Sequence, residues 1–394
     1  MPVVTELDLY AVDLPFKTTF RHAAAARRAS ESLFLRIRLD GRGQGWGECL
    51  PRPYVSAERR EDAFLLLRDA IMPALMGQEF RSFGDVIAFL EKCDGKAPSD
   101  WVSSETPQSA AWCAVDLALL DAFGKAFGEA ARLRATGHVA STGDELGGVR
   151  YSGVVSADRG WRFALSLLKM RLYRFPHVKL KVAREDAVRA ARFARRLLGQ
   201  RVDVRVDANM AWDVEQALGL IRDFQALGIE WFEAPVAADN LSGLARLVRE
   251  SSAGIMADEG LTDRVSLQRL VANKACTGVN VRISKCGGLV AAHARCREAL
   301  DAGLALQVGC QVGESSLLSA AHVTLLSALA PLTPGVRYAE GCFGRHLLRE
   351  DPVSPAVQFG YAGHPPAPPS GPGLGVYVDQ DTLERWTVDE AHVS

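Results

Sequence analysis

The sequence lacks the features that mark secreted, membrane and nucleic-acid-binding proteins. Its 394 residues carry 46 Lys and Arg against 47 Asp and Glu, so the net charge of −1 gives no attraction to a polyanion. Segment 1–16 alternates like a β-strand and lacks the basic and apolar regions of a signal peptide, and no run of about 18 apolar residues occurs. We therefore expect a cytoplasmic protein with no nucleic-acid and no membrane partner.

Metal-thiolate and nucleotide-binding motifs are also absent. The eight cysteines are scattered, with no CxxC pair and no cluster of Cys and His. This excludes the common zinc motifs and indicates reduced core thiols rather than disulfides. No GxGxxG motif follows a predicted strand, which argues against a nucleotide-binding open sheet.

A regular alternation of strand-like and helical segments is present from about residue 148 to residue 341. Eight short β-rich runs recur there, and the segments between them have apolar residues at helical spacing, as in "EDAVRAARFARRLL". Strands that alternate with helices of this length form parallel βαβ units. The predicted fold class is therefore α/β, with a modified (β/α)8 (TIM) barrel, and the open doubly wound sheet is the alternative.

The segments on either side of this region have other patterns. Residues 1–140 contain alternating runs with a Gly-rich turn, as in "LFLRIRLDGRGQGWGECL", followed by helical stretches, which predicts an α+β domain. The barrel domain is expected over residues 141–350. The segment 351–394 begins rich in Pro and Gly, and we expect it to return and pack on the first domain.

Acidic residues stand at the ends of three predicted barrel strands. Asp207, Glu233 and Asp258 are spaced by about one βα unit each. Because the C-terminal strand ends of a barrel meet at one rim, these carboxylates should converge, where they would repel one another unless a cation lies among them. A single Asp after a strand is more often a helix N-cap, but three together favour a hard divalent ion, Mg²⁺ or alternatively Mn²⁺.

Two lysines lie one residue apart in the run "HVKLK". Lys179 and Lys181 should face the same side of their strand and enter the same pocket, although solvated edge charges are the alternative. A metal that binds a substrate carboxylate stabilises the charge that appears when the α-proton leaves. We assign Lys181 as the acid/base and Lys179 as the neighbouring ammonium that promotes its deprotonation, with the exchange of these roles left open.

The motifs "KLK", "VDAN", "WFEAP", "MADEG" and "NVRISKCGG" together resemble the enolase superfamily, and specifically its muconate-lactonizing subgroup of muconate cycloisomerase and mandelate racemase-like enzymes. The segments "GWGECLPRPYVS" and "GPGLGVYVDQDTL" are similar to that family's capping domain and C-terminal return, so the resemblance covers nearly the whole chain. It implies that Asp207, Glu233 and Asp258 bind Mg²⁺, with Asn209 and Glu259 next to them.

The resemblance also implies where a small-molecule carboxylate substrate would bind. Capping loops 16–30 and 50–56 and the ends of the seventh and eighth strands would contact it. A homo-oligomer is expected as well, because family members often form dimers or octamers. The residues expected to bind the substrate are His22, Arg52, Tyr54, Glu314 and Glu340. For Glu340, contact with a cationic group and pairing with a nearby base are equally open alternatives.

One residue departs from the family pattern. The family usually has a second lysine on the sixth strand, where this chain has Arg282, so that two lysines flank the α-carbon. Arginine stays protonated at any working pH and is a poor proton acceptor. Lys285 lies three residues further on and is a candidate replacement base, while Arg282 is expected to bind a second anionic group or to hold an enolate by its charge.

From the resemblance and this departure, we expect an isomerase or lyase that abstracts the proton α to a carboxylate through an enediolate. A one-base cycloisomerase or β-elimination lyase (dehydratase) is favoured, because racemisation usually needs a base on each face of the α-carbon. A racemase or epimerase of a dipeptide or amino-acid derivative is the alternative. A non-catalytic relative that only binds a ligand stays open, since a fold does not establish a function.

Overall fold

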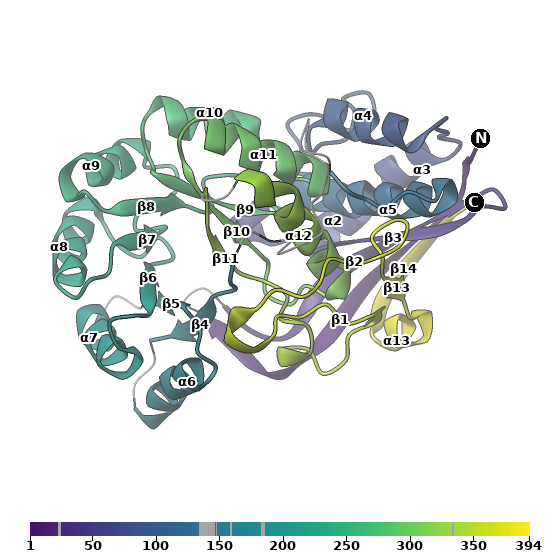
Figure 1. The fold of residues 1–394 in the computed structure, drawn as a ribbon. Coiled ribbons are helices and arrows are strands. Elements are labelled where there is room, and N and C mark those ends of the chain that lie inside the picture. Colours follow the sequence, from purple (N-terminus) through teal and green to yellow (C-terminus); the bar gives the residue numbers. More distant parts are fainter. Residues whose placement is uncertain (23–24, 134–145, 147, 158–159, 183–185, 333–334) are drawn as a thin grey trace.

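The computed structural model describes residues 1–22, 25–133, 146, 148–157, 160–182, 186–332 and 335–394. A ring of parallel strands and helices lies beside an antiparallel sheet with its own helices, and both chain ends lie at this sheet (Figure 1). Among the described residues, no helix is long and apolar enough to span a membrane. All eight cysteines are free thiols, as expected of core residues.

The N-terminal sheet has the antiparallel strand order β14-β1-β2-β3. The C-terminal strand pairs along β1, for example at Leu9 and Ala391, which ties the end of the chain to its beginning. Helix α5 packs on β3 at Gly45 and Gly47, where an added Cβ would lie within 2.0 Å of backbone atoms of the helix. The bounds are β1 Val4–His22, β2 Ala25–Leu39, β3 Gly43–Cys49, α1 Pro53–Ser56, α2 Arg60–Leu66, α3 Met72–Leu75, α4 Phe83–Cys93, α5 Ser109–Phe127 and β14 Thr387–Val393.

Eight parallel strands follow in sequence order and form the barrel, which confirms the predicted fold class. They are β4 Gly153–Ser156, β5 His177–Lys181, β6 Asp203–Asp207, β7 Trp231–Glu233, β8 Gly254–Ala257, β9 Gly278–Arg282, β10 Ala305–Gly309 and β11 Val336–Ala339. A parallel bridge between Tyr151 and Ala339 joins the first strand to the last, with Ser152 N donating to Ala339 O at 2.9 Å. This bridge closes the ring.

Seven helices connect these strands. They are α6 Trp161–Leu172, α7 Ala187–Leu198, α8 Val214–Gln225, α9 Leu241–Ser251, α10 Arg264–Ala272, α11 Leu289–Asp301 and α12 Ser316–Leu329. Asp213 and Asp263 form capping boxes at the starts of α8 and α10, which is the ordinary role of an acid before a helix. After β11 the chain makes only a one-turn helix at Gly344–His346 before it returns through β12 Val353–Ser354, β13 Tyr377–Val378 and α13 Gln380–Arg385.

Buried carboxylates join the N-terminal part to the loops that follow the barrel strands. Glu48 accepts hydrogen bonds from Ser315 N at 3.0 Å and Ser315 Oγ at 2.5 Å, at the start of α12. Asp116 accepts from Leu289 N at 2.7 Å, at the start of α11. The N-terminal part therefore covers the C-terminal rim of the barrel. The boundary at 140/141 lies outside the described residues, so the predicted domain limits stay predictions.

Candidate active site

Three buried carboxylates stand side by side at the C-terminal rim of the barrel. Asp207 ends β6 and Glu233 ends β7, and the two residues are paired in the strand register. Asp258 follows β8 directly. Each of the three is at most 2% exposed. An isolated buried carboxylate is costly, so each must have compensating donors or cations.

Lys179 and Lys181, both on β5, reach this row of carboxylates from one side. Lys179 Nζ lies 3.3 Å from Asp207 Oδ2, 3.3 Å from Glu233 Oε2 and 2.7 Å from Glu340 Oε2. Although burial favours the neutral amine, Glu233, Glu340 and Asp207 raise the pKa of Lys179 well above its usual value. Within the described part of the chain, Lys181 Nζ has one such contact, 3.5 Å from Asp207 Oδ2, and its side chain is 17% exposed.

Glu233 lies at the centre of the row and is held by several donors. Beyond Lys179, it accepts hydrogen bonds from Asn280 Nδ2 at 3.0 Å and Gln307 Nε2 at 3.1 Å. Burial opposes its ionisation, but Lys179 and the other neighbouring cations hold the pKa of Glu233 well below its usual range. Glu233 is therefore a carboxylate at neutral pH.

Arg282 and Lys285 approach the same row from the opposite side. Arg282 ends β9 and donates from Nη2 to Asp258 Oδ2 and, at 3.2 Å, from Nη1 to Gln311 Oε1. Burial favours its neutral form, but Asp258 raises the pKa of Arg282 further above its usual range. Lys285 is 0% exposed and donates to Asp258 O, Asp258 Oδ1 and Asn280 O at 2.6, 3.0 and 2.8 Å. This enclosure argues against the predicted role of Lys285 as a replacement base.

Sequence reasoning missed three polar residues that hold this arrangement: Arg205, Asn280 and Gln307. Arg205 pairs with Glu340, and the two amides bind Glu233. Each of these residues lies two positions before the last residue of its strand, so its side chain faces the barrel interior one layer below the rim. A polar residue at this position of a barrel strand is the signal that could have found them.

The carboxylate oxygens at this rim are the ligands that a hard divalent cation prefers. In this structure, lysine and arginine side chains of the protein contact these carboxylates. In the part of the chain that the structure describes, no group of three or more His, Cys, Asp or Glu side chains is arranged to hold a metal ion. Beside Asp258, however, Glu259 Oε2 is buried and has no hydrogen-bond partner among the described residues. Asn209 donates from its backbone N to Asp207 Oδ1 at 3.1 Å. Three carboxylates with an unsatisfied oxygen beside them fit an oxygen-ligated ion.

The residues predicted to bind substrate lie in different surroundings. Glu340 is paired with Lys179 and Arg205, so its carboxylate contacts cations of the protein, and its role as a substrate ligand stays a prediction. Glu314 is buried and accepts from Gln311 N at 2.6 Å, and burial raises its pKa to about 8. His22 ends β1, and its side chain lies outside what the structure describes.

Loop 50–56 lies beside the end of β9, and its contact with a substrate stays a prediction. Leu50 N donates to Ser284 Oγ at 3.0 Å, two residues after Arg282. Arg52 is 2% exposed and donates from Nη1 to Pro51 O and Glu31 O at 2.9 and 3.2 Å, so part of its guanidinium holds the loop to β2. Tyr54 is 39% exposed.

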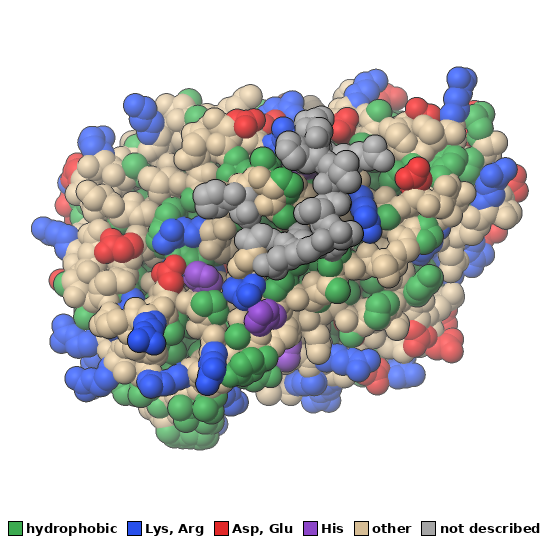
Figure 2. Space-filling model, in the orientation of Figure 1, with side chains coloured by type: hydrophobic (Ala, Val, Ile, Leu, Met, Phe, Trp, Pro, Cys, Tyr) green, Lys and Arg blue, Asp and Glu red, His purple; other side chains and the backbone are tan. Residues whose placement is uncertain are grey.

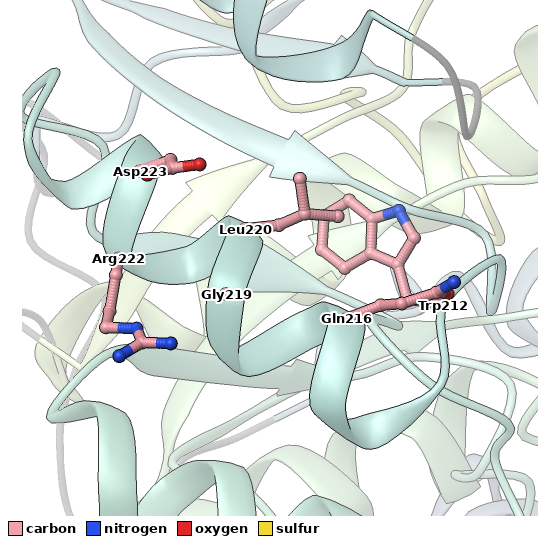
Figure 3. Close-up of a pocket in the computed structure, with 6 residues that line it drawn as sticks. All are labelled: Trp212, Gln216, Gly219, Leu220, Arg222 and Asp223. Carbon is pink, nitrogen blue, oxygen red and sulfur yellow. The ribbon is translucent and has the colours of Figure 1, made fainter.

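One surface cavity lies apart from this site. It measures about 550 Å³ and lies at the outer helix α8, with Leu220 and Trp212 among the residues that line it (Figure 3). The residues that line it are Trp212, Gln216, Gly219, Leu220, Arg222 and Asp223. None of these is a predicted site residue.

Comparison with known proteins shows which family and which enzymes this chain resembles. The family model "Enolase C-terminal domain-like" matches residues 163–382. An N-succinyl-L-Arg/Lys racemase of Bacillus cereus is 25% identical, with 98% of each chain covered, and a chloromuconate cycloisomerase of Cupriavidus pinatubonensis is 26% identical over 95% of this chain and 96% of its own. A dipeptide epimerase structure from Cytophaga hutchinsonii, complexed with Mg and the dipeptide D-Ala-L-Val, has a TM-score of 0.83 at 21% identity and covers 100% of both chains.

Proposed function

This chain belongs to the enolase C-terminal domain-like family, and on that premise we propose that it is an Mg²⁺-dependent enzyme that removes the proton α to a substrate carboxylate, with Lys181 as the base. Both curated relatives named above are enzymes, a racemase and a cycloisomerase. The proposal names the base and the ligands in this chain.

The contrast between the two β5 lysines carries the proposal. Lys179 has three carboxylate partners within 3.3 Å, which hold it as a permanent ammonium. Among the described residues, Lys181 has a single carboxylate contact, at 3.5 Å, and it is the more exposed of the two lysines. A general base must exchange its proton with substrate and solvent, so Lys181 is the better candidate.

Asp207, Glu233 and Asp258 would hold the Mg²⁺ ion. When bound, the ion binds the substrate carboxylate and stabilises the negative charge that develops on it. Lys179 keeps Glu233 and Asp207 oriented, and Asn280 and Gln307 fix the Glu233 carboxylate from below. Glu259 and Asn209 lie next to the ligands, and Glu259 supplies an acceptor that is still unsatisfied.

Arg282 determines the reaction type in this proposal. Its guanidinium stays charged beside Asp258, so it can attract an anion or an enediolate but cannot take a proton from the substrate. With Lys285 enclosed, the Lys181 side is the one that carries an accessible lysine among the described residues of the pocket. A one-base cycloisomerisation or β-elimination fits this arrangement, because β-elimination removes the α-proton from one face only and cycloisomerisation, its reverse, returns a proton to one face only.

A racemase or epimerase of an amino-acid derivative or dipeptide is the second candidate. It is favoured by the names of the relatives, which include a racemase of N-succinylated amino acids. The two candidates differ in whether a proton is returned to the opposite face of the α-carbon. A small carboxylate substrate, a cytoplasmic location and a homo-oligomeric state complete the proposal.

Mass spectrometry on pooled carboxylates tests the proposal. Muconates, sugar acids, N-acyl amino acids and dipeptides would be incubated with the enzyme and Mg²⁺ in D₂O, beside a Lys181→Ala control. A compound that loses water or cyclises supports the one-base reaction, and one that only gains a deuterium with inversion supports the racemase. Turnover that persists in Lys181→Ala would reject Lys181 as the base.

A further inference from the structure

Arg205 is a buried cation that takes no direct part in the proposed reaction. Lys and Arg side chains normally stay in solvent, as many do on the face drawn in Figure 2. Arg205, on β6, is 1% exposed, and its side chain faces the barrel interior two residues before Asp207. A charge enclosed in this way is costly, so groups around Arg205 must compensate it.

Arg205 and Lys179 are direct neighbours in the barrel sheet. The parallel register of β5 and β6 pairs the two residues, so their charged side chains enter the barrel side by side. Two like charges at this spacing repel each other. Glu340, directly after β11, relieves this repulsion, because its Oε2 lies 2.7 Å from Lys179 Nζ and its Oε1 accepts a hydrogen bond from Arg205 Nη2. One carboxylate therefore bridges the two cations, with one oxygen for each.

Other parts of the barrel fix the position of the Arg205 guanidinium. Its Nη1 donates to Ser152 Oγ at 3.0 Å, and its central carbon lies 4.1 Å from the centre of the Tyr338 ring. The Tyr338 hydroxyl in turn donates to Asp203 Oδ2 at 2.9 Å, at the start of β6. A planar guanidinium that is stacked on a ring and bonded at one nitrogen has little freedom to move. Arg205 therefore presents Nη2 to Glu340 from a fixed place.

Lys179 shares its charge among three carboxylates. Two of them, Asp207 and Glu233, are proposed metal ligands at 3.3 Å, and the third, Glu340, is closer at 2.7 Å. Arg205 gives Glu340 a second cation, so this carboxylate does not depend on the Lys179 ammonium alone. Without Arg205, we expect Lys179 to move toward Glu340 and away from the two ligands, because no other cation would compete for Glu340.

Arg195 shows what a buried arginine with a structural role looks like in this chain. It lies on α7, is 6% exposed and donates to four backbone carbonyl oxygens at 2.7 to 3.3 Å. Its contacts hold main-chain segments together. Arg205 differs, because it pairs with an acidic side chain that itself contacts a cation of the site, Lys179. The contacts of Arg205 therefore lead to the reacting centre and not only to the scaffold.

We propose that Arg205 is a positioning residue for the reaction, which acts through Glu340 to set where the Lys179 ammonium stands between the metal ligands. Arg205 holds Glu340, and Glu340 holds Lys179. Lys179 then supplies positive charge next to the carboxylates of the site. This inference rests on the proposed function and adds to it a residue that does not touch the substrate.

Steady-state kinetics of Arg205→Met with an accepted carboxylate tests this role. Met removes the charge and keeps an unbranched side chain. We expect kcat to fall by about 10- to 100-fold, as for other residues that orient the ligands of a metal site, while KM changes by less than about three-fold. Arg205→Lys keeps a cation near Glu340 and should recover part of kcat. Arg195→Met, the matched control, should lower Tm and keep kcat within about two-fold of wild type.

A double variant tests whether Arg205 acts through Glu340. Arg205→Met leaves the Glu340 carboxylate short of a cation, whereas Arg205→Met combined with Glu340→Gln removes both charges of the pair. In the Glu340→Gln background, loss of Arg205 should therefore change kcat by less than about three-fold. An equal loss of kcat in both backgrounds would overturn the coupling. The double variant keeps this test open if Arg205→Met alone does not fold, because it leaves Arg205 and Glu340 without an unpaired charge.

Crystal structures of the wild type and of Arg205→Met, or of Arg205→Lys if the first does not fold, separate this inference from the proposed function. Both proteins would be crystallised without metal under the same conditions. We expect Lys179 Nζ in the variant to lie closer to Glu340 and farther from Asp207 and Glu233. An unmoved Lys179, or wild-type kcat in a folded Arg205→Met, would overturn the positioning role. A wild type that turns over no carboxylate would reject the proposed function, while the position of Lys179 would still decide this inference.

Discussion

Strands β5 and β9 face the same row of carboxylates from opposite sides, and their cations have the same layout. Each side has one enclosed cation, Lys179 at 3% and Lys285 at 0% exposure. Each also has one cation nearer the opening, Lys181 with 17% and Arg282 with 13% of its side chain exposed. The two sides therefore match in charge and differ in chemistry, because only a lysine can give up its proton at a working pH.

The difference between Lys181 and Arg282 shows that electrostatic balance and proton transfer are separate requirements at this rim. The buried carboxylates need cations from both sides, and either Lys or Arg satisfies that need. Proton abstraction needs an amine that can become neutral, and only the β5 side offers one near the opening. The pocket is therefore symmetric in charge and one-sided in reactivity.

Loss of the Lys181 amine should have the largest effect on turnover. Lys181→Ala removes the proposed base, and we expect turnover to fall by about 10³-fold or more, within the range known for general bases. Mg²⁺ binding by calorimetry should stay close to wild type, because Asp207, Glu233 and Asp258 remain. Lys92→Ala, an exposed lysine on α4, is the control. Turnover within ten-fold of wild type in Lys181→Ala would contradict the assignment.

Making the two sides chemically equal should change the reaction more than it changes the fold. Arg282→Lys provides an amine on the β9 side, and we expect turnover of the native substrate to fall by about ten-fold while α-deuterium exchange from the second face appears. Nuclear magnetic resonance of the substrate in D₂O measures both. Improved native turnover in this variant would show that Arg282 has no specific role in holding an anion.

Removal of the carboxylate shared by both sides should abolish the response to metal. We expect Mg²⁺ at about 100 times its Kd to stabilise the wild type by about 2.7 kcal/mol, seen as a rise of a few degrees in Tm. Glu233→Gln should lose this rise, since it removes a ligand, whereas Glu105→Gln at an exposed site should keep it. An unchanged rise in Glu233→Gln would exclude Glu233 from the metal site.

The smallest predicted effect is at Glu314, which lies between β10 and α12. Burial raises the pKa of Glu314 to about 8, so the folded state binds more protons than the unfolded state between about pH 4.5 and pH 8. This contribution to stability is complete at low pH and is lost as the pH rises through about 8. Calorimetry from pH 6 to 8.5 should show a fall in Tm of about a few degrees that Glu314→Gln reduces. An identical pH profile in the variant would contradict the raised pKa.

The barrel could be predicted from the sequence because its signal is repeated. Eight β-rich runs alternate with helical segments, and the register that puts Asp207 beside Glu233 follows from parallel strands that end at one rim. The return of the C-terminal segment to β1 was also expected, and β14 shows it. Such features depend on patterns of many residues, so single exceptions do not obscure them.

The partners of the site residues could not be predicted in the same way. Glu340, after the eighth barrel strand, contacts Lys179 on the second strand. Nothing in the sequence indicates that these two residues lie close together. The enclosure of Lys285 depends on two backbone carbonyls, those of Asp258 and Asn280, which every residue possesses. Charge identity can be read from a sequence, but which cation is enclosed depends on packing in three dimensions.

The most direct test of one-sided reactivity is the exchange of the α-proton resolved by enantiomer. Each enantiomer of an accepted carboxylate would be incubated separately with the enzyme and Mg²⁺ in D₂O, and deuterium and configuration would be followed by nuclear magnetic resonance and chiral chromatography. Our account predicts exchange in one enantiomer only, with retained configuration and no exchange in Lys181→Ala. Exchange in both enantiomers with their interconversion would contradict it and would require a second base on the Arg282 side.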